Sequence, residues 1–142
     1  TGYGTGYNIV NVFATGAIIP EAINASNLLL EEGVFANVVN VTGPGPLYRR
    51  FQESTRMKVR GSGTQEPFLY EIMSVGERSA PIVTVVDGAP QALAWIGAAM
   101  KTTTLPLGVT SFGQSGSPID LYKEYEIDAE SIMAACFGAL DI

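Results

Sequence analysis

The chain has 142 residues, of which 46% are hydrophobic and 15% are charged; this excludes a disordered chain and fits one domain large enough to bury a sizeable core. The net charge is −6 and the basic residues form no extended stripe, so nucleic acid is not expected as a partner. The apolar runs are short and interrupted, which predicts no membrane span. The absence of histidine excludes histidine-based hydrolysis and histidine ligation of zinc.

The first seven residues, Thr1 to Tyr7, contain three glycines but precede a strand. A phosphate-binding loop would follow a strand and open a helix, so we predict a flexible leader or the end of an edge strand instead. The domain itself is predicted to span residues 8–142. The chain begins with Thr and shows no signal peptide, so we expect a segment of a longer protein. A single cysteine suits a reducing, cytoplasmic compartment.

The next residues predict a strand, a helix and a second strand. Asn8–Phe13 is rich in β-branched residues, and Ala17–Glu32 carries an apolar stripe at helical spacing that Gly33 ends. Phe35–Val41 is nearly all apolar, so we expect a strand covered on both faces. Such a unit predicts a right-handed crossover and a parallel pair of strands.

Two turns after predicted strands are candidate ligand positions. Gly16 lies at a strand-to-helix turn, where open α/β sheets often bind ligands, but the full glycine fingerprint is absent. Asp87 is the best acidic candidate for a polar role, although capping of the following helix is the favoured interpretation. Whether either turn binds a ligand is left open by the sequence.

A turn at Thr42–Pro46 is followed by a predicted short helix, Leu47–Thr55, with its apolar residues facing inward. This region holds the chain's one basic cluster. A solvated face or a surface for acidic residues is the favoured interpretation, and contact with a partner subunit or an anionic segment of missing domains is the alternative. The cluster comprises Arg49, Arg50, Arg56, Lys58 and Arg60.

Further along, Phe68–Val75 is predicted as a short helix or an irregular segment. Ile82–Val86 is a third strand, and Ala89-Pro90 opens a helix that runs to Met100. Leu105–Val109 predicts a fourth strand. The alternation of strands and helices predicts a three-layer α/β/α sandwich with a mostly parallel sheet of four or five strands.

The final segment predicts two helices. Ser117 is the expected N-cap of the first, with Pro118 at its first position, and Asp128 starts the second. Cys136 lies on the apolar face of the second helix and is expected to be buried rather than nucleophilic.

The last forty residues also resemble the closing signature of the transketolase C-terminal domain. Within that superfamily, the whole chain most resembles the homodimeric pyruvate dehydrogenase decarboxylating component, a thiamine-diphosphate enzyme. The residues that carry the resemblance are Phe112-Gly113, Ser115, Leu121-Tyr122, Tyr125, Ile127 and Ala129, together with Val38–Thr42, Pro44, Leu47, Tyr48, Ala80–Thr84 and Leu93–Trp95.

The resemblance implies a parent enzyme that decarboxylates a 2-oxo acid, expected to be pyruvate, with thiamine diphosphate and Mg²⁺. It implies transfer of the acyl group to a lipoyl-bearing acyltransferase, and a homodimer that the C-terminal domain supports. The Gly-Asp-Gly cofactor motif is absent here, so we expect no catalytic, cofactor-binding or metal-binding residue on this chain. Histidines that the family often carries near the Asp87 turn are replaced by Gly88–Gln91. A fifth, edge strand is also expected from the resemblance alone.

Three other functions stay open at this point: the C-terminal domain of a transketolase, a regulatory or binding module of the same fold, and a small enzyme or nucleotide binder of flavodoxin-like shape. The aromatic residues Phe112, Tyr122 and Tyr125 exceed what one short helix needs for its core. They are expected either at an interface with the dimer mate or the preceding domain, or in the core of the domain itself.

Overall fold

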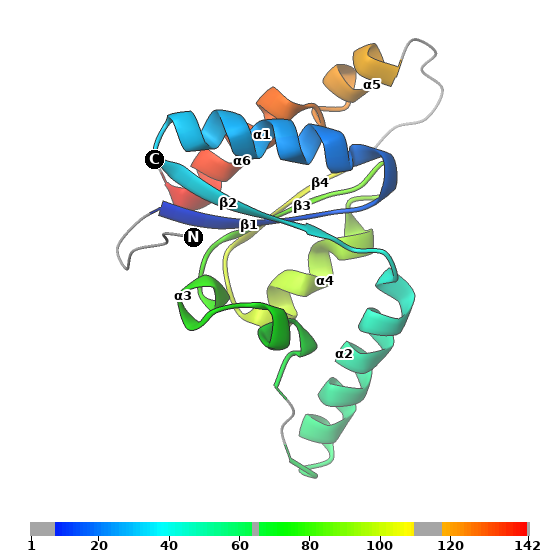
Figure 1. Cartoon of the computed structure of the whole chain (residues 1–142). Helices are drawn as coiled ribbons and strands as arrows, with labels where there is room; N and C mark the ends of the chain where they lie inside the picture. The colour runs from blue at the N-terminus through cyan, green and yellow to red at the C-terminus, as the bar shows by residue number, and fades with distance from the viewer. Residues whose placement is uncertain (1–7, 64–65, 110–117, 142) are drawn as a thin grey trace.

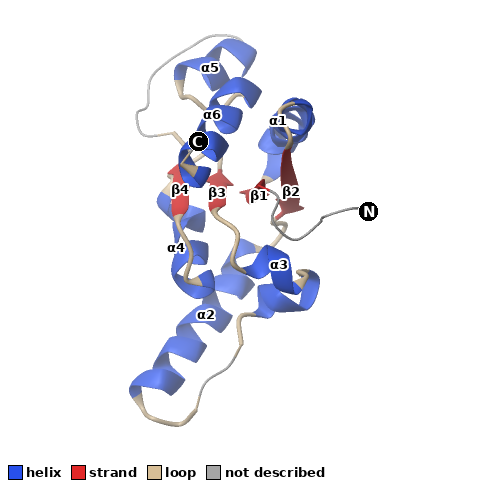
Figure 2. Ribbon diagram, turned by 90° about the vertical axis from the view of Figure 1, so that its left-hand side faces the viewer, coloured by secondary structure: helices blue, strands red, loops and turns tan. Residues whose placement is uncertain are grey.

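The computed structural model describes residues 8–63, 66–109 and 118–141. Their centre is a four-stranded, wholly parallel sheet with the order β2-β1-β3-β4 (Figure 1). The strands are β1 (Asn8–Ala14), β2 (Val34–Asn40), β3 (Ile82–Val85) and β4 (Thr104–Leu107). Helices cover both faces of the sheet, as Figure 2 shows, so the predicted three-layer α/β/α sandwich is confirmed.

The two central strands, β1 and β3, are buried because each has a neighbouring strand on both sides and helices above and below. Every residue of β3 and the last five of β1 are buried. The expectation that Phe35–Val41 is covered on both faces is confirmed: Ala36 and Val38 pack against the core on one face, and Val39 and Val41 belong to the core on the other. The cover is partial, because β2 is an outer strand of the described sheet and only Val34 in it is buried. The expected fifth strand would fall on residues outside the described ones.

One face of the sheet packs against α1 (Ile19–Glu31) and α6 (Ala129–Leu140) (Figure 2). The helix after β1 begins later than predicted because Gly16, with φ +56°, starts a short 3₁₀ turn, η1 (Gly16–Ile18). Pro20 lies in the first turn of α1, where its missing N–H costs nothing. The core on this side consists of Val10, Val12, Ala14, Ile18, Ala22, Ala25, Leu29, Val34, Val83, Val85, Ile127, Ile132, Cys136 and Ala139.

The opposite face packs against α4 (Gln91–Met100) and the segment that holds η2 (Phe68–Ile72) and α3 (Val75–Arg78). Predicted as a short helix or irregular, residues 68–75 form η2 and the start of α3. The core on this side consists of Phe13, Val41, Leu69, Met73, Ile82, Val86, Leu93, Ile96 and Met100. None of the described helices is long and apolar enough to cross a membrane.

Helix α2 (Pro44–Val59) is longer than the predicted Leu47–Thr55 and extends away from the sheet (Figure 1). The interpretation of Thr42–Pro46 as a chain breaker is wrong for its second half, because Pro44 and Pro46 occupy the first turn of this helix. The inward packing predicted for its apolar residues is only partial: α2 has no buried residue, and Tyr48 is 41% exposed.

The last two helices are α5 (Pro118–Glu124) and α6. The predicted start at Asp128 is confirmed, since its carboxylate accepts a hydrogen bond from the Ser131 N–H at 3.3 Å. The Glu21 carboxylate of α1 accepts the Ala129 N–H at 2.9 Å, which ties the two helices of this layer together. The predicted N-cap Ser117 lies outside the described residues.

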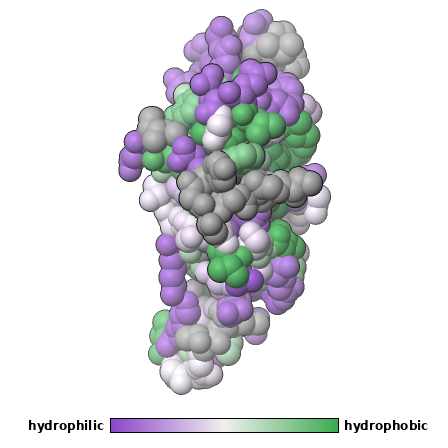
Figure 3. Space-filling model, turned by 60° about the vertical axis from the view of Figure 1, so that its left-hand side comes forward, coloured by the Kyte–Doolittle hydropathy of each residue, from purple (hydrophilic) through white to green (hydrophobic). Residues whose placement is uncertain are grey.

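The aromatics of this segment pack on the α1 side of the sheet. Tyr122 and Tyr125 are half-buried there and pack against the core, as one of the two predictions for these residues expected. Each side chain also keeps an exposed part. Phe112 lies outside the described residues. On the face drawn in Figure 3, hydrophobic residues lie in separate patches among hydrophilic ones.

Gly97 allows α4 to approach β4 closely. A Cβ atom added there would lie 2.6 Å from the Cβ of Thr104, a separation that no rotamer change can relieve. Gly97→Ala is therefore expected to lower the free energy of unfolding by about 1–3 kcal/mol, despite the better helix propensity of Ala. Denaturant unfolding measures this. The control is Gly45→Ala in α2, where a Cβ meets nothing within 4 Å and stability should stay equal or rise; equal gains for both variants would contradict the close approach.

Candidate functional site

The strand order creates a topological switch point at the carboxyl edge of the sheet. From β1 the chain passes through α1 to β2 on one side, whereas the strand on the other side of β1 is β3. In open α/β sheets the loops diverge at such a point, and ligands commonly bind in the crevice between them.

The structure has a hollow of about 500 Å³ at this edge. The Gly16 and Asp87 turns, far apart in the sequence and singled out there as candidates, both line it. Residues at the end of β2 and in the loop after it also line the hollow. The sequence did not single them out, although their position at the carboxyl end of a predicted strand could have marked them as candidate ligand contacts. The lining residues are Thr15, Gly16, Asn40, Val41, Thr42, Pro44, Val86, Asp87, Gly88, Ala92 and Leu93. We name this region the carboxyl-edge hollow.

Asp87 does not cap the following helix, so that interpretation is wrong. The N-cap of α4 is Pro90, which makes no side-chain capping bond, and Asp87 is exposed beside the hollow. Its turn is held from the neighbouring loop, where the Val109 N–H donates to the Gly88 carbonyl at 2.7 Å. Gly108 permits this contact, since a Cβ there would lie 2.6 Å from the same oxygen.

The carboxyl-edge hollow does not fit thiamine diphosphate with Mg²⁺. Mg²⁺ needs several oxygen ligands, and a diphosphate needs cations or a backbone cradle. Asp87 is the one charged residue among those lining the hollow, and it is negative. Across residues 8–63, 66–109 and 118–141, no group of three His, Cys, Asp or Glu side chains could hold a metal ion. The hollow can offer hydrogen bonds through Thr15, Asn40 and Asp87.

Cys136 is fully buried in the α1-side core, as the sequence predicted. Burial raises the pKa of its thiol from 9.0 to about 12, so the reactive thiolate is suppressed at neutral pH. We expect iodoacetamide to modify the native thiol at pH 8 at least about 100-fold more slowly than the urea-unfolded chain. Equal rates would show that the residue is accessible.

The same pKa shift has a consequence for stability. The unfolded thiol ionises near pH 9.0 and the folded thiol near pH 12, so ionisation favours the unfolded chain in this range. The contribution of the buried thiol is present below pH 9 and declines as the pH rises toward 12.

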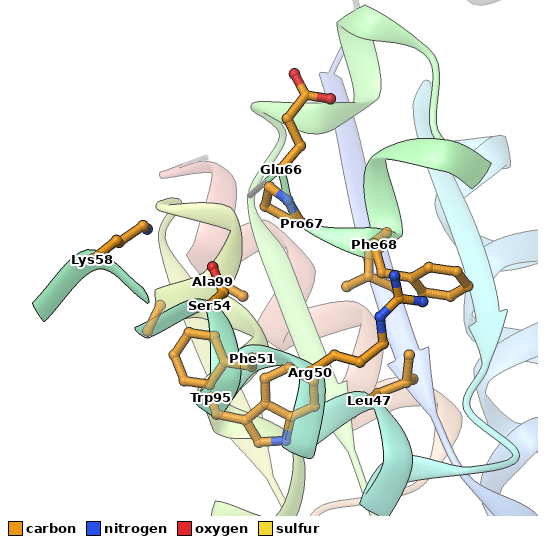
Figure 4. A pocket seen from close by; sticks show the side chains of 12 residues that line it. Leu47, Arg50, Phe51, Ser54, Lys58, Glu66, Pro67, Phe68, Trp95 and Ala99 are labelled. Atoms are coloured by element: carbon orange, nitrogen blue, oxygen red, sulfur yellow. The ribbon is translucent and has the colours of Figure 1, made fainter. Parts of the chain in front are cut away.

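The predicted basic cluster lies on α2 and its C-cap, Arg60. Beside the helix lies a half-enclosed slot of about 60 Å³, shown in Figure 4, between α2, α4 and the start of η2. The Arg50 guanidinium lies 4.5 Å from the centroid of the Phe68 ring, and the Phe51 and Trp95 rings stack at 5.4 Å. These aromatic contacts hold the base of α2 to the body of the domain.

The fold and the carboxyl-edge geometry define the class of protein: an open, parallel α/β domain with a hollow at the carboxyl edge of its sheet. The family model of the transketolase-like C-terminal domain matches residues 5–128. The chain belongs to this family.

The curated relatives are pyruvate dehydrogenase E1 components. The protein from Buchnera aphidicola is 31% identical over 140 residues, covering 93% of this chain and 15% of the relative. The Corynebacterium glutamicum protein is 27% identical over 140 residues, covering 98% of this chain and 15% of the relative. The chain thus spans about 15% of the length of these relatives.

Several solved transketolases have the same fold. A split-gene transketolase, described as an inactive β4 tetramer, matches with a TM-score of 0.62 at 21% identity, over 96% of this chain and 40% of that one. A transketolase from Pichia stipitis, solved with xylulose 5-phosphate, matches with a TM-score of 0.63 at 18% identity. The match covers 98% of this chain and 17% of that one.

Proposed function

We propose that the chain is the C-terminal, non-catalytic domain of a thiamine-diphosphate-dependent 2-oxo-acid dehydrogenase that acts on pyruvate. The observation that carries this proposal is the nature of the curated relatives: pyruvate dehydrogenase E1 components at 25–31% identity along more than nine-tenths of this chain. The domain comprises residues 8–142, and residues 1–7 are a leader or the end of an edge strand.

The site chemistry supports a non-catalytic role. The chain has no histidine, its cysteine is buried, and the described residues hold no group of three His, Cys, Asp or Glu side chains that could bind a metal ion. Thiamine diphosphate and Mg²⁺ would then be held by other domains of the parent enzyme. Within that enzyme the domain supports the homodimer and shapes the approach to the active site, and the acyl group passes to a lipoyl-bearing acyltransferase. A cytoplasmic location goes with this function.

A transketolase is the second candidate, because the matching solved structures are transketolases with TM-scores of 0.57–0.63. Identities of 16–21% to those chains support the shared fold and do not distinguish the substrate. A stand-alone regulatory or binding module of this fold is the third.

The reading frame upstream of the Thr1 codon tests these proposals. We expect it to encode a Gly-Asp-Gly motif with a downstream Asn, and the parent enzyme to release CO₂ from pyruvate. Activity with xylulose 5-phosphate and none with pyruvate would favour the transketolase. A stop codon and ribosome-binding site directly upstream would favour the stand-alone module.

A further inference from the structure

The charges of this chain are strongly segregated. Five of its eight Lys and Arg residues lie between residues 44 and 60, with Glu53 as the one acid there, which gives this stretch a net charge of +4. The three remaining cations and thirteen remaining acids give the rest of the chain a net charge of −10. This separation gives the surface around residues 44–60 a positive field in an otherwise negative chain.

The helix that carries these cations is exposed on the side that bears Arg49, Arg56 and Arg60. All five are exposed, and none of the 16 residues of α2 is buried. Arg49, Arg56 and Arg60 recur at a spacing of seven and four, which aligns them on one face of the helix, and they line a shared hollow. Val59, at the far end, is 82% exposed.

The opposite side of α2 offers an apolar slot between cations. Its wall contains Phe51, Phe68 and Trp95, and three charged residues also line it: Arg50, Lys58 and the acid Glu66 (Figure 4). Its volume of about 60 Å³ compares with ~10–15 Å³ for one water, so it has room for a small side chain and not for a cofactor.

We propose that α2 and this slot form a docking surface for an acidic protein segment, which places its carboxylates along the arginine face and one aliphatic side chain in the slot. Charge complementarity selects the segment, and the slot fixes its position along the helix. The curated relatives extend well beyond the length of this chain, so the parent protein has ample sequence to supply such a segment.

A nucleic acid is the less suitable occupant, although aromatic and basic residues also bind single strands. The basic stretch is short, about 24 Å for 16 helical residues, which offers a phosphate backbone few contacts. The Phe51 and Trp95 rings also stack on each other rather than presenting free faces.

Trp95 is the chain's one tryptophan and lines the slot, so its fluorescence reports directly on occupation. The probe is a peptide of eight glutamates with one central leucine, titrated at low ionic strength against a peptide in which glutamine replaces every glutamate. We expect saturable quenching by the acidic peptide alone, weakening as salt rises.

Three variants locate the binding. The double variant Arg49→Glu/Arg56→Glu should lower the affinity for the acidic peptide about tenfold. The effect is moderate because each exposed charge pair contributes little binding free energy. Lys101→Glu with Lys123→Glu makes the same change of net charge away from α2 and should leave the affinity unchanged. Ala98→Phe fills the slot and should also weaken binding, and circular dichroism verifies that each variant is folded.

Several results would overturn the proposal. Equal loss in both charge variants would show a net-charge effect without a site. Tighter binding of a single-stranded oligonucleotide of equal charge would assign the surface to nucleic acid. Concentration-dependent sedimentation abolished by the Arg49/Arg56 variant, with no peptide response, would assign it to a second copy. No response to either peptide would mean that the surface is only solvated.

Discussion

Phe13→Ala is expected to lower the free energy of unfolding by about 3–5 kcal/mol, the largest effect of any single truncation considered for this chain. Phe13 is fully buried in the central strand β1, and it packs in the core that α4 closes. Both neighbouring strands, β2 and β3, fix its backbone through the ladder. The surroundings therefore cannot collapse into the space left behind, and the full cavity term is retained.

Urea unfolding followed by Trp95 fluorescence measures this effect. The matched control is Phe51→Ala on α2, a residue that is only half-buried and lies on a helix with no buried position. The decrease in the free energy of unfolding caused by Phe51→Ala should be clearly smaller than that caused by Phe13→Ala. A Phe13→Ala loss of under about 1 kcal/mol, or one equal to that of Phe51→Ala, would contradict the assignment of β1 to the core.

Asn11→Leu is expected to cost about 2–4 kcal/mol even though it makes the core more apolar. The Asn11 side chain is fully buried, and its Nδ2 donates to the Glu77 carbonyl at 2.8 Å. Its Oδ1 accepts from Asn37 Nδ2 at 3.1 Å. Leucine has a similar size but offers neither bond, so the Glu77 carbonyl of α3 keeps only the Ala80 N–H at 3.2 Å and the Asn37 amide loses this acceptor.

The control for Asn11→Leu is Asn8→Leu, in the same strand at an exposed position, which should change stability by less than about 0.5 kcal/mol. Chemical denaturation of both variants gives the comparison. If Asn11→Leu proves neutral or stabilising, the hydrogen bonds at this position contribute no net stability.

The sequence predicted the alternation of elements well because short-range signals set it. β-branched runs, Gly33 after the first helix and Asp128 before the last each act within a few residues, and the structure has an element boundary near each one. The parallel pairing followed from the crossover rule and is confirmed for all three strand pairs.

Properties that depend on distant partners were not predictable in the same way. β2 has the composition of a central strand but lies at one edge of the sheet that the described residues form, because strand order is set by tertiary packing. Prolines 44 and 46 act as breakers in most contexts, but at the start of α2 their fixed φ suits the helix. The sequence could name the Gly16 and Asp87 turns separately. Their meeting at one hollow follows from β1 and β3 being neighbours, which no local signal contains.

Titration calorimetry of the 142-residue chain with thiamine diphosphate and Mg²⁺ tests most directly whether this domain of the transketolase-like family binds the cofactor by itself. The carboxyl-edge hollow lacks cations and a second carboxylate, so the expected result is a heat signal indistinguishable from dilution. An intact thiamine-diphosphate enzyme serves as the positive control. Saturable binding near one cofactor per chain, with a dissociation constant in the micromolar range, would contradict the account.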